Sequence, residues 1–340
     1  MKIVYLIGNG LDVKLNLKTR YKEFYDNAYT IQDGDSDHVK SLKEDIKENI
    51  QDWADLEKAL GEYSTKVTSE NTYLELFKDI RNKLVAYIAQ QELNLSLTDD
   101  QRDEFINRFR TPFQYLVEGE TNEFNTYINN LNRSELLIDF ITFNYTKTLE
   151  VLLNFDGEQI LIKKQGRMDL FISKIEHIHG FTNARFVLGV DNEAQILNDK
   201  FRSEKLLRTI VKPINNSKAK HLADKRCLAH IHDANIICLY GMSIGETDKT
   251  WWQYIGEHIL NYDKRLIIFW WDNDTDISPI YSEVRLDKID DIKDRFLSQT
   301  NLDDKQKKSI WDKIYVVYKQ DEIFSVPLND NGYDQTTKTI

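Results

Sequence analysis

Short apolar runs recur along the chain, and several of them end at a glycine or a small polar residue. The first, "KIVYLI" at residues 2–7, is rich in β-branched and aromatic side chains and stops at Gly8, which predicts a buried strand. Further strands are predicted at "ELLIDFITF" (135–143), "IEHIHG" (175–180), "ANIICLYGMS" (234–243), "KRLIIFWW" (264–271) and "KIYVVY" (313–318).

Helical periodicity fills the intervals between these runs. A helix is predicted from about Thr19 through "RYKEFYDNAY", because Tyr21, Phe24, Tyr25 and Ala28 recur at helical spacing. Further helices are predicted at "NYTKTLEVLL" (144–153), at "DKTWWQYIGEHILNY" (248–262) and near residues 291–315. From Asp33 to Asn132 charge is high, glycine and proline are scarce, and apolar residues return every three or four positions, which predicts a long helical stretch.

Strands that alternate with helices are typical of a parallel sheet wound with helices. The predicted fold is therefore α/β, a Rossmann-like parallel sheet with a large helical insertion. We expect residues 1–30 and 133–275 to form the core and residues 31–132 to form the insertion. Residues 276–340 are expected to form a C-terminal α/β extension that packs on the core.

Charge limits the partners that this fold can have. The formal net charge is −11 and the isoelectric point is about 5.2, so the whole molecule is not an electrostatic binder of nucleic acid. One segment, residues 200–226, is basic, and His221, His230 and His232 lie in or near it. A nucleic-acid-directed toxin is one hypothesis for this segment, although a run of charges is more often a solvated surface.

The two cysteines, Cys227 and Cys238, do not have the spacing of a zinc pair and are too few for a disulfide framework. We interpret them as ordinary thiols of a reducing cytosol. The apolar run Ile3–Ile7 is shorter than the core of a signal peptide, and no apolar stretch approaches the roughly 18 residues that span a bilayer. A soluble, cytoplasmic protein without membrane contact is predicted.

Four of the predicted strands end in the turns "GNG", "FNYT", "HIHG" and "GMS". Ligands of open parallel sheets bind beyond the carboxyl ends of the strands, so we expect these turns to meet in one crevice. Gly8 and Gly10 would let the backbone approach a phosphate, and the following helix would offer N–H groups to an anion. The dinucleotide fingerprint G-x-G-x-x-G is not met, because residue 13 is valine, and a purely structural glycine turn is an equal alternative.

The polar residues of the next two turns also have two interpretations each. Asn144 either caps a helix or projects a fixed amide into the crevice. His177 and His179 have the spacing of a metal pair, but the other histidines provide no matching ligands, so no metal is expected. His179 precedes Gly180 and is the better candidate for a general base, with a hydrogen-bonded structural histidine as the alternative.

Three tryptophan-bearing segments are interpreted mainly as structure. In "DWADLEKAL" (52–60), Trp53, Leu56 and Leu60 fit the buried stripe of one helix, while Asp55 or Glu57, more readily Glu57, is a candidate helper carboxylate. Trp251–Trp252 and "FWW" (269–271) are favoured as core or as a contact in a homo-oligomer over a base-stacking platform.

Taken in order, these turns resemble the abortive infection AbiH family of phage-defence proteins. The motifs are Gly8-Asn9-Gly10 with Asp12, Phe143-Asn144-Tyr145-Thr146 with Leu149-Glu150, His177-Ile178-His179-Gly180, and Gly241-Met242-Ser243 with Asp248. "DWADLEKAL" is similar to a W-x-D-x-E segment of that family. The resemblance extends over nearly the whole chain and implies a sirtuin-like core that binds NAD.

The resemblance also implies a role for each motif. Gly8 and Gly10 would face the pyrophosphate, and Asn144 and His179 would flank the nicotinamide ribose as the catalytic pair. Gly241 and Ser243 would meet the adenosine half. Asn9, Asp12, Tyr145 and Asp248 complete the expected binding set.

Two departures from the resemblance narrow the expected chemistry. Residues 16–18 read Asn-Leu-Lys in place of a Gly-Leu-Pro-like step, and the four cysteines of a sirtuin zinc ribbon are missing, which disfavours deacylation. The expected function is hydrolysis of NAD, as substrate, to nicotinamide and ADP-ribose during infection, switched on by a phage-derived trigger or regulatory partner. A nucleotide-sensing module without turnover and the nucleic-acid-directed toxin are the alternatives.

Overall fold

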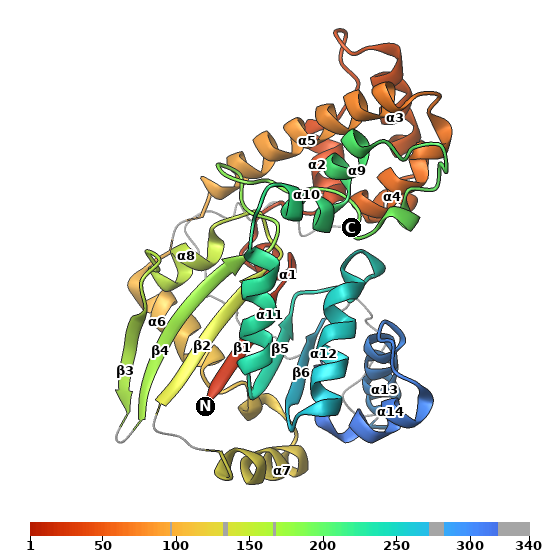
Figure 1. Ribbon diagram of the computed structural model, residues 1–340. Coiled ribbons are helices and arrows are strands. Elements are labelled where there is room, and N and C mark those ends of the chain that lie inside the picture. Colours follow the sequence, from red (N-terminus) through yellow and green to blue (C-terminus); the bar gives the residue numbers. More distant parts are fainter. Residues whose placement is uncertain (96, 132–134, 166–167, 272–281, 319–340) are drawn as a thin grey trace, which may run out of the picture.

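The computed structural model describes residues 1–95, 97–131, 135–165, 168–271 and 282–318, and its centre is a seven-stranded sheet (Figure 1). The strands are β1 (Lys2–Ile7), β2 (Glu135–Thr142), β3 (Ile160–Gln165), β4 (Met168–His177), β5 (Ile236–Tyr240), β6 (Arg265–Trp270) and β7 (Ile314–Tyr318). Their order is β3-β4-β2-β1-β5-β6-β7, and every neighbouring pair is parallel except β3 and β4. The predicted α/β class with a mostly parallel sheet is confirmed.

The order of the strands determines where the sheet can bind a ligand. Without the antiparallel strand β3, the parallel strands stand in the order third, second, first, fourth, fifth, sixth along the chain, which is a doubly wound order. Strand β1 pairs on one side with β2 and on the other with β5, so Tyr5 lies between Phe140 and Cys238. The chain winds outward in opposite directions from β1 and β5, and the topological switch point lies between their carboxyl ends.

Helices cover both faces of the sheet, because successive strand residues point to opposite faces and both sets are apolar. One face, which includes Tyr5 and Phe140, packs against α6 (Asp99–Phe109), α7 (Glu118–Asn129) and α8 (Thr148–Leu153). The other face, which includes Leu6 and Ile237, packs against helices from the second half of the chain. These are α11 (Ala223–Asp233), α12 (Lys249–Asn261), α13 (Ser282–Ser298) and α14 (Asp304–Ile310).

A third group of helices lies beyond the carboxyl edge of the sheet, at the top of Figure 1. It contains α2 (Tyr21–Ala28), α3 (Asp37–Glu48), α4 (Leu56–Tyr63), α5 (Glu70–Glu92), α9 (Glu204–Ile210) and α10 (Lys212–Lys218), and the five-residue α1 (Gly10–Lys14) lies beneath it. Phe24, Trp53, Phe77 and Leu206 share its separate apolar core. Short 3-10 turns span Asp52–Ala54, Ser64–Lys66, Pro112–Tyr115, Glu193–Gln195, Glu246–Asp248 and Trp311–Lys313.

Most predicted elements are confirmed, including the strand at 313–318 and the helix after Thr19. The prediction did not include α1, β3 or the helices within the basic segment 200–226. Trp53, Leu56 and Leu60 are buried as expected, but Trp53 lies in a 3-10 turn before α4 and not on the same helix. The proposed domain limits stay a prediction, and the parts of the C-terminal extension at 276–281 and 319–340 lie outside the described residues.

Glycine packing joins the turns that follow β1 and β5. Gly241 has a φ of +66°, and a Cβ atom there would lie 2.7 Å from the Cα of Gly10. We therefore expect Gly241→Ala to lower the free energy of unfolding by about 2–4 kcal/mol, because both the strained φ and the backbone overlap must be relieved. Urea unfolding measures this change. Gly119→Ala is the control, since Gly119 lies in α7 with open space around it and should gain a little stability; equal effects at the two positions would contradict the prediction.

Candidate functional site

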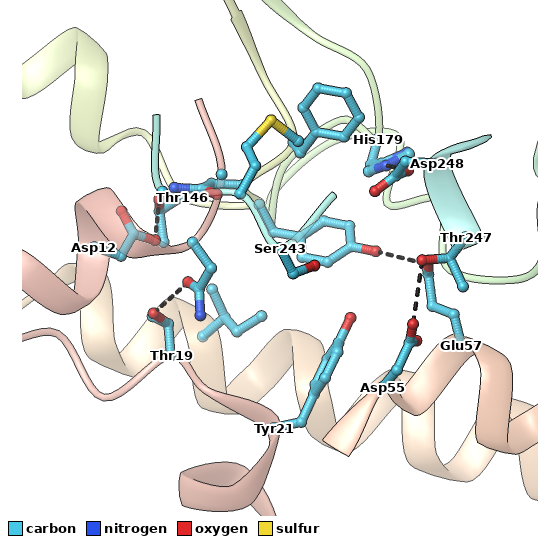
Figure 2. Close-up of a pocket in the computed structure, with 18 of the residues that line it drawn as sticks. Asp12, Thr19, Tyr21, Asp55, Glu57, Thr146, His179, Ser243, Thr247 and Asp248 are labelled. Carbon is cyan, nitrogen blue, oxygen red and sulfur yellow. Dashed lines mark hydrogen bonds and ion pairs between the residues drawn. The ribbon is translucent and has the colours of Figure 1, made fainter. Parts of the chain in front are cut away.

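A polar cavity of about 270 Å³ lies at the switch point, between the carboxyl ends of the strands and the helical group above them (Figure 2). It is lined by Gly8, Asn9, Asp12, Thr19, Tyr21, Ala54, Asp55, Glu57, Ile88, Phe143, Asn144, Tyr145, Thr146, His179, Gly241, Met242, Ser243, Thr247 and Asp248. All four turns singled out in the sequence contribute to this wall. The expected convergence of the turns is therefore observed, while the chemical roles assigned to their residues stay predictions.

The glycine turn after β1 is held by the turn after β5. The N–H of Gly8 donates to the carbonyl of Tyr240, and the N–H of Gly10 donates to the carbonyl of Gly241, both at 2.9 Å. A Cβ atom on Gly8 would lie 2.5 Å from the oxygen of Gly241. The need for glycine here is thus explained by close packing of backbone. Because these two N–H groups are already bonded, a ligand phosphate would have to use other donors.

Asp12 is the most buried carboxylate of the cavity wall, with 1% of its surface exposed. The Thr146 hydroxyl donates to its Oδ2 at 2.7 Å, and its Oδ1 has no hydrogen-bond partner among the described residues. Burial raises the pKa of Asp12 to about 6, although hydrogen bonds from Thr146, Thr148 and Asn144 act in the opposite direction. A carboxylate held in this way gains stability from any cation that enters the cavity.

Asn144 does not cap a helix, so that interpretation is wrong. Helix α8 has Lys147 at its N-cap position, with no side-chain hydrogen bond there. Asn144 is buried in the cavity wall, and its backbone carbonyl oxygen lies 3.3 Å from Nδ1 of His177. Nε2 of His177 lies 2.7 Å from Glu150. His177 therefore stabilises the turn that contains Asn144. In the part of the chain that the structure describes, no group of three potential metal ligands occurs.

His179 lies on the opposite side of the cavity from Asp12 (Figure 2). Its Nε2 is 3.7 Å from Oδ1 of Asp248, and its buried Nδ1 has no hydrogen-bond partner among the described residues. The ring is flanked by the rings of Phe143 and Tyr145, at centroid distances of 5.6 and 6.1 Å. Nε2 is thus oriented toward a carboxylate.

Lys212, Glu57 and Asp248 form an ion network next to His179. Nζ of Lys212 lies 2.8 Å from Glu57 and 3.5 Å from Asp248, and both Lys212 and Glu57 are buried. Burial disfavours the ammonium ion, but Glu57 and Asp248 outweigh this effect and raise the pKa of Lys212. Burial also raises the pKa of Glu57. For Asp248, burial acts upward, but Lys212 and His179 together lower the pKa.

Sequence reasoning missed the role of Lys212 because it lies within a run of exposed basic residues. The only sequence feature that indicates a buried Lys212 is local. The apolar residues Ile210 and Val211 precede it and are buried, and Pro213 follows it at the start of α10. Other cations of segment 200–226 form surface ion pairs: Lys218 with Glu204, Arg226 with Glu176, and Arg202 with Asp199. Glu57, the helper carboxylate weighed in the sequence, does reach the cavity wall, and so do Asp55, Tyr21 and Thr247.

The remaining predicted residues also lie at or near the cavity. The Tyr145 hydroxyl donates to the carbonyl of Val187 at 3.1 Å and lies 3.4 Å from Glu57. Oδ1 of Asn9 accepts a hydrogen bond from Thr19 at 2.6 Å. Ser243 is exposed.

A second cavity of about 740 Å³ adjoins the first and shares Asn9, Gly241, Met242 and Ser243 with it. Its other lining residues are Gly10, Val13, Lys14, Asn16, Arg20, Tyr240, Phe269, Trp270, Trp271, Arg295 and Val317. Trp252 is a core residue as predicted, whereas Trp271 is 55% exposed at this cavity and is not part of the core. The described walls of the two cavities differ in charge, since four carboxylates are among the described residues of the first and three cations are among those of the second.

Fold and site together define an α/β protein with a buried polar site at the switch point of a doubly wound sheet. The family model for bacteriophage abortive infection AbiH matches residues 4–270, and the chain belongs to this family. Membership points to phage abortive infection. A comparison with curated proteins found no match. None of the helices in the described residues is both long and apolar enough to span a membrane.

Proposed function

We propose that this protein acts in abortive infection by hydrolysing NAD to nicotinamide and ADP-ribose, on a core of sirtuin type. The position of the site supports the proposal, because dinucleotides bind doubly wound sheets at the switch point between the first and fourth parallel strands. The order of the glycine turn, Asn144, His179 and the Gly241-Met242-Ser243 turn supports it as well.

The observation that carries the proposal is the charge difference between the adjoining cavities. NAD has a positive charge on its nicotinamide ring and negative charges on its pyrophosphate. The first cavity has Asp12, Asp55, Glu57 and Asp248 in its wall, and no lysine or arginine is among its described lining residues. Cleavage of the bond between nicotinamide and ribose passes through an oxocarbenium-like cation, which carboxylates in a buried cavity stabilise.

The proposed reaction needs a positioned water and one base. Water attacks C1′ of the ribose while the bond from C1′ to the nicotinamide nitrogen breaks, and nicotinamide leaves as a neutral molecule with the bonding electrons. Asn144 positions the water or a ribose hydroxyl through its side-chain amide, and His179 accepts the proton that the water loses. Asp248 keeps the His179 ring in orientation and stabilises the imidazolium ion that results.

The direct test is incubation of purified protein with NAD, followed by chromatography of nicotinamide and ADP-ribose. Asn144→Ala and His179→Ala are each expected to lower the rate on the order of a hundredfold or more, as the loss of other positioned polar groups does. His232→Ala is a matched control, because His232 is an exposed histidine of α11 outside the cavity. No release of nicotinamide, even after addition of lysate from phage-infected cells, would overturn the hydrolase and favour nucleotide sensing without turnover.

A further inference from the structure

Among the described residues that line the second cavity there are three cations, Lys14, Arg20 and Arg295, and no carboxylate. Lys14 lies over the ring of Trp271, and the guanidinium of Arg295 lies over the ring of Trp270, each 5.3 Å from the ring centroid. Neither cation has an ion pair with another described residue, and Arg20 has only an exposed contact of 3.6 Å with Glu23. Cations that rest on aromatic faces keep their full charge for a ligand. In a chain of net charge −11, the described wall of this cavity is therefore locally cationic.

The shape and the walls of the cavity fit a nucleotide. Its volume of about 740 Å³ lies within the usual range of small-molecule sites. The exposed ring of Trp271 offers a flat apolar face on which a base can stack. The second cavity shares Gly241 and Ser243 with the first cavity. A dinucleotide whose nicotinamide ribose lies beside His179 would therefore extend across these two residues, and its adenosine end would lie among the cations of the second cavity.

The charged groups around that adenosine end indicate which dinucleotide is preferred. In doubly wound dinucleotide folds, a carboxylate accepts a hydrogen bond from the free 2′-hydroxyl of NAD, whereas an arginine accommodates the 2′-phosphate of NADP. The described residues that line the second cavity include two arginines and a lysine but no carboxylate. Arginine also binds phosphate by paired hydrogen bonds, which makes the preference for a phosphate strong.

We propose that the second cavity selects a dinucleotide with a phosphate on the 2′-oxygen of its adenosine ribose, so that NADP is the preferred substrate. This inference rests on the dinucleotide hydrolysis proposed above for NAD. Arg295 and Lys14 are the specificity-determining residues, and they act on substrate choice and not on the bond that breaks.

Calorimetric titration of the full chain with 2′-phospho-ADP-ribose and with ADP-ribose tests the proposal. These are the products that NADP and NAD hydrolysis release, so binding is measured without turnover. The wild-type protein is expected to bind the 2′-phosphorylated compound at least about tenfold more tightly. Arg295→Met should reduce that ratio several-fold. Arg81→Met is the matched control, because the Arg81 guanidinium also lies over a ring, that of Phe77, but outside both cavities.

The possible failures are distinguishable. Equal affinity for the two compounds, or an unchanged ratio in Arg295→Met, would overturn the preference for the 2′-phosphate and leave NAD hydrolysis standing wherever nicotinamide is released. If neither compound binds and neither NAD nor NADP is cleaved, the proposed function itself fails, and this inference fails with it.

Discussion

Lys212→Met is expected to lower the free energy of unfolding by about 3–4 kcal/mol at pH 7. Methionine preserves the length of the side chain but removes the ammonium ion that Glu57 and Asp248 face. Glu57 is buried, so in the variant it must bind a proton in the folded state. Its pKa in the unfolded chain is about 4.3, and keeping it protonated at pH 7 accounts for this cost. Urea unfolding monitored by tryptophan fluorescence measures the change.

The pH dependence of this loss identifies its cause. In the variant, the folded-state pKa of Glu57 lies further above its unfolded value, so the loss grows with rising pH by up to about 1.4 kcal/mol per unit. The double variant Lys212→Met with Glu57→Gln removes the uncompensated charge and should recover most of the stability. A double variant no more stable than Lys212→Met would show that the ion pair is not the cause. Lys218→Met, at an exposed lysine of the same helix, should leave stability unchanged.

Much of the sheet was predictable because its strands are buried on both faces. Continuous apolar runs such as residues 2–7 and 135–143 are typical of such strands, and the glycine or asparagine that follows each of these two runs indicated where a turn would be. β3 was missed because it is an edge strand with lysines, "ILIKKQ", whose pattern is that of a solvated surface. Helix α1 was missed because five residues are too few for a periodic pattern.

The site was predictable only in part, for a different physical reason. Asn144 and His179 each lie two residues beyond the carboxyl end of a parallel strand, β2 and β4, so their proximity follows from topology alone. The contact between Glu57 and Lys212 joins residues 155 positions apart and depends on how the helical group packs over the sheet. Periodicity along the chain carries no information about such a contact. The composition of the basic segment 200–226 instead favoured an exposed Lys212, because most lysines are solvated.

At Asp12, the stability of the fold and the proposed function place opposite demands on a single side chain. Its folded-state pKa of about 6 lies above the value of an unfolded aspartate, so the folded protein binds this proton more tightly than the unfolded chain does. The stabilisation that results is complete below about pH 4 and is lost as the pH rises through about 6. At neutral pH, the ionised Asp12 therefore destabilises the fold, and the cavity retains an anion that a cationic transition state can use.

Asp12→Asn is accordingly expected to raise the free energy of unfolding at pH 7 by up to about 3 kcal/mol, and to leave it unchanged near pH 4, where the wild-type residue is protonated. The same variant should release nicotinamide on the order of tenfold or more slowly, and the wild-type rate should fall as the pH drops through about 6. Urea unfolding at both pH values and the chromatographic assay measure the two effects. Asp291→Asn, at an exposed residue of α13, is the control. A variant less stable than wild type at pH 7 would mean that the hydrogen bond from Thr146 outweighs the burial of the charge.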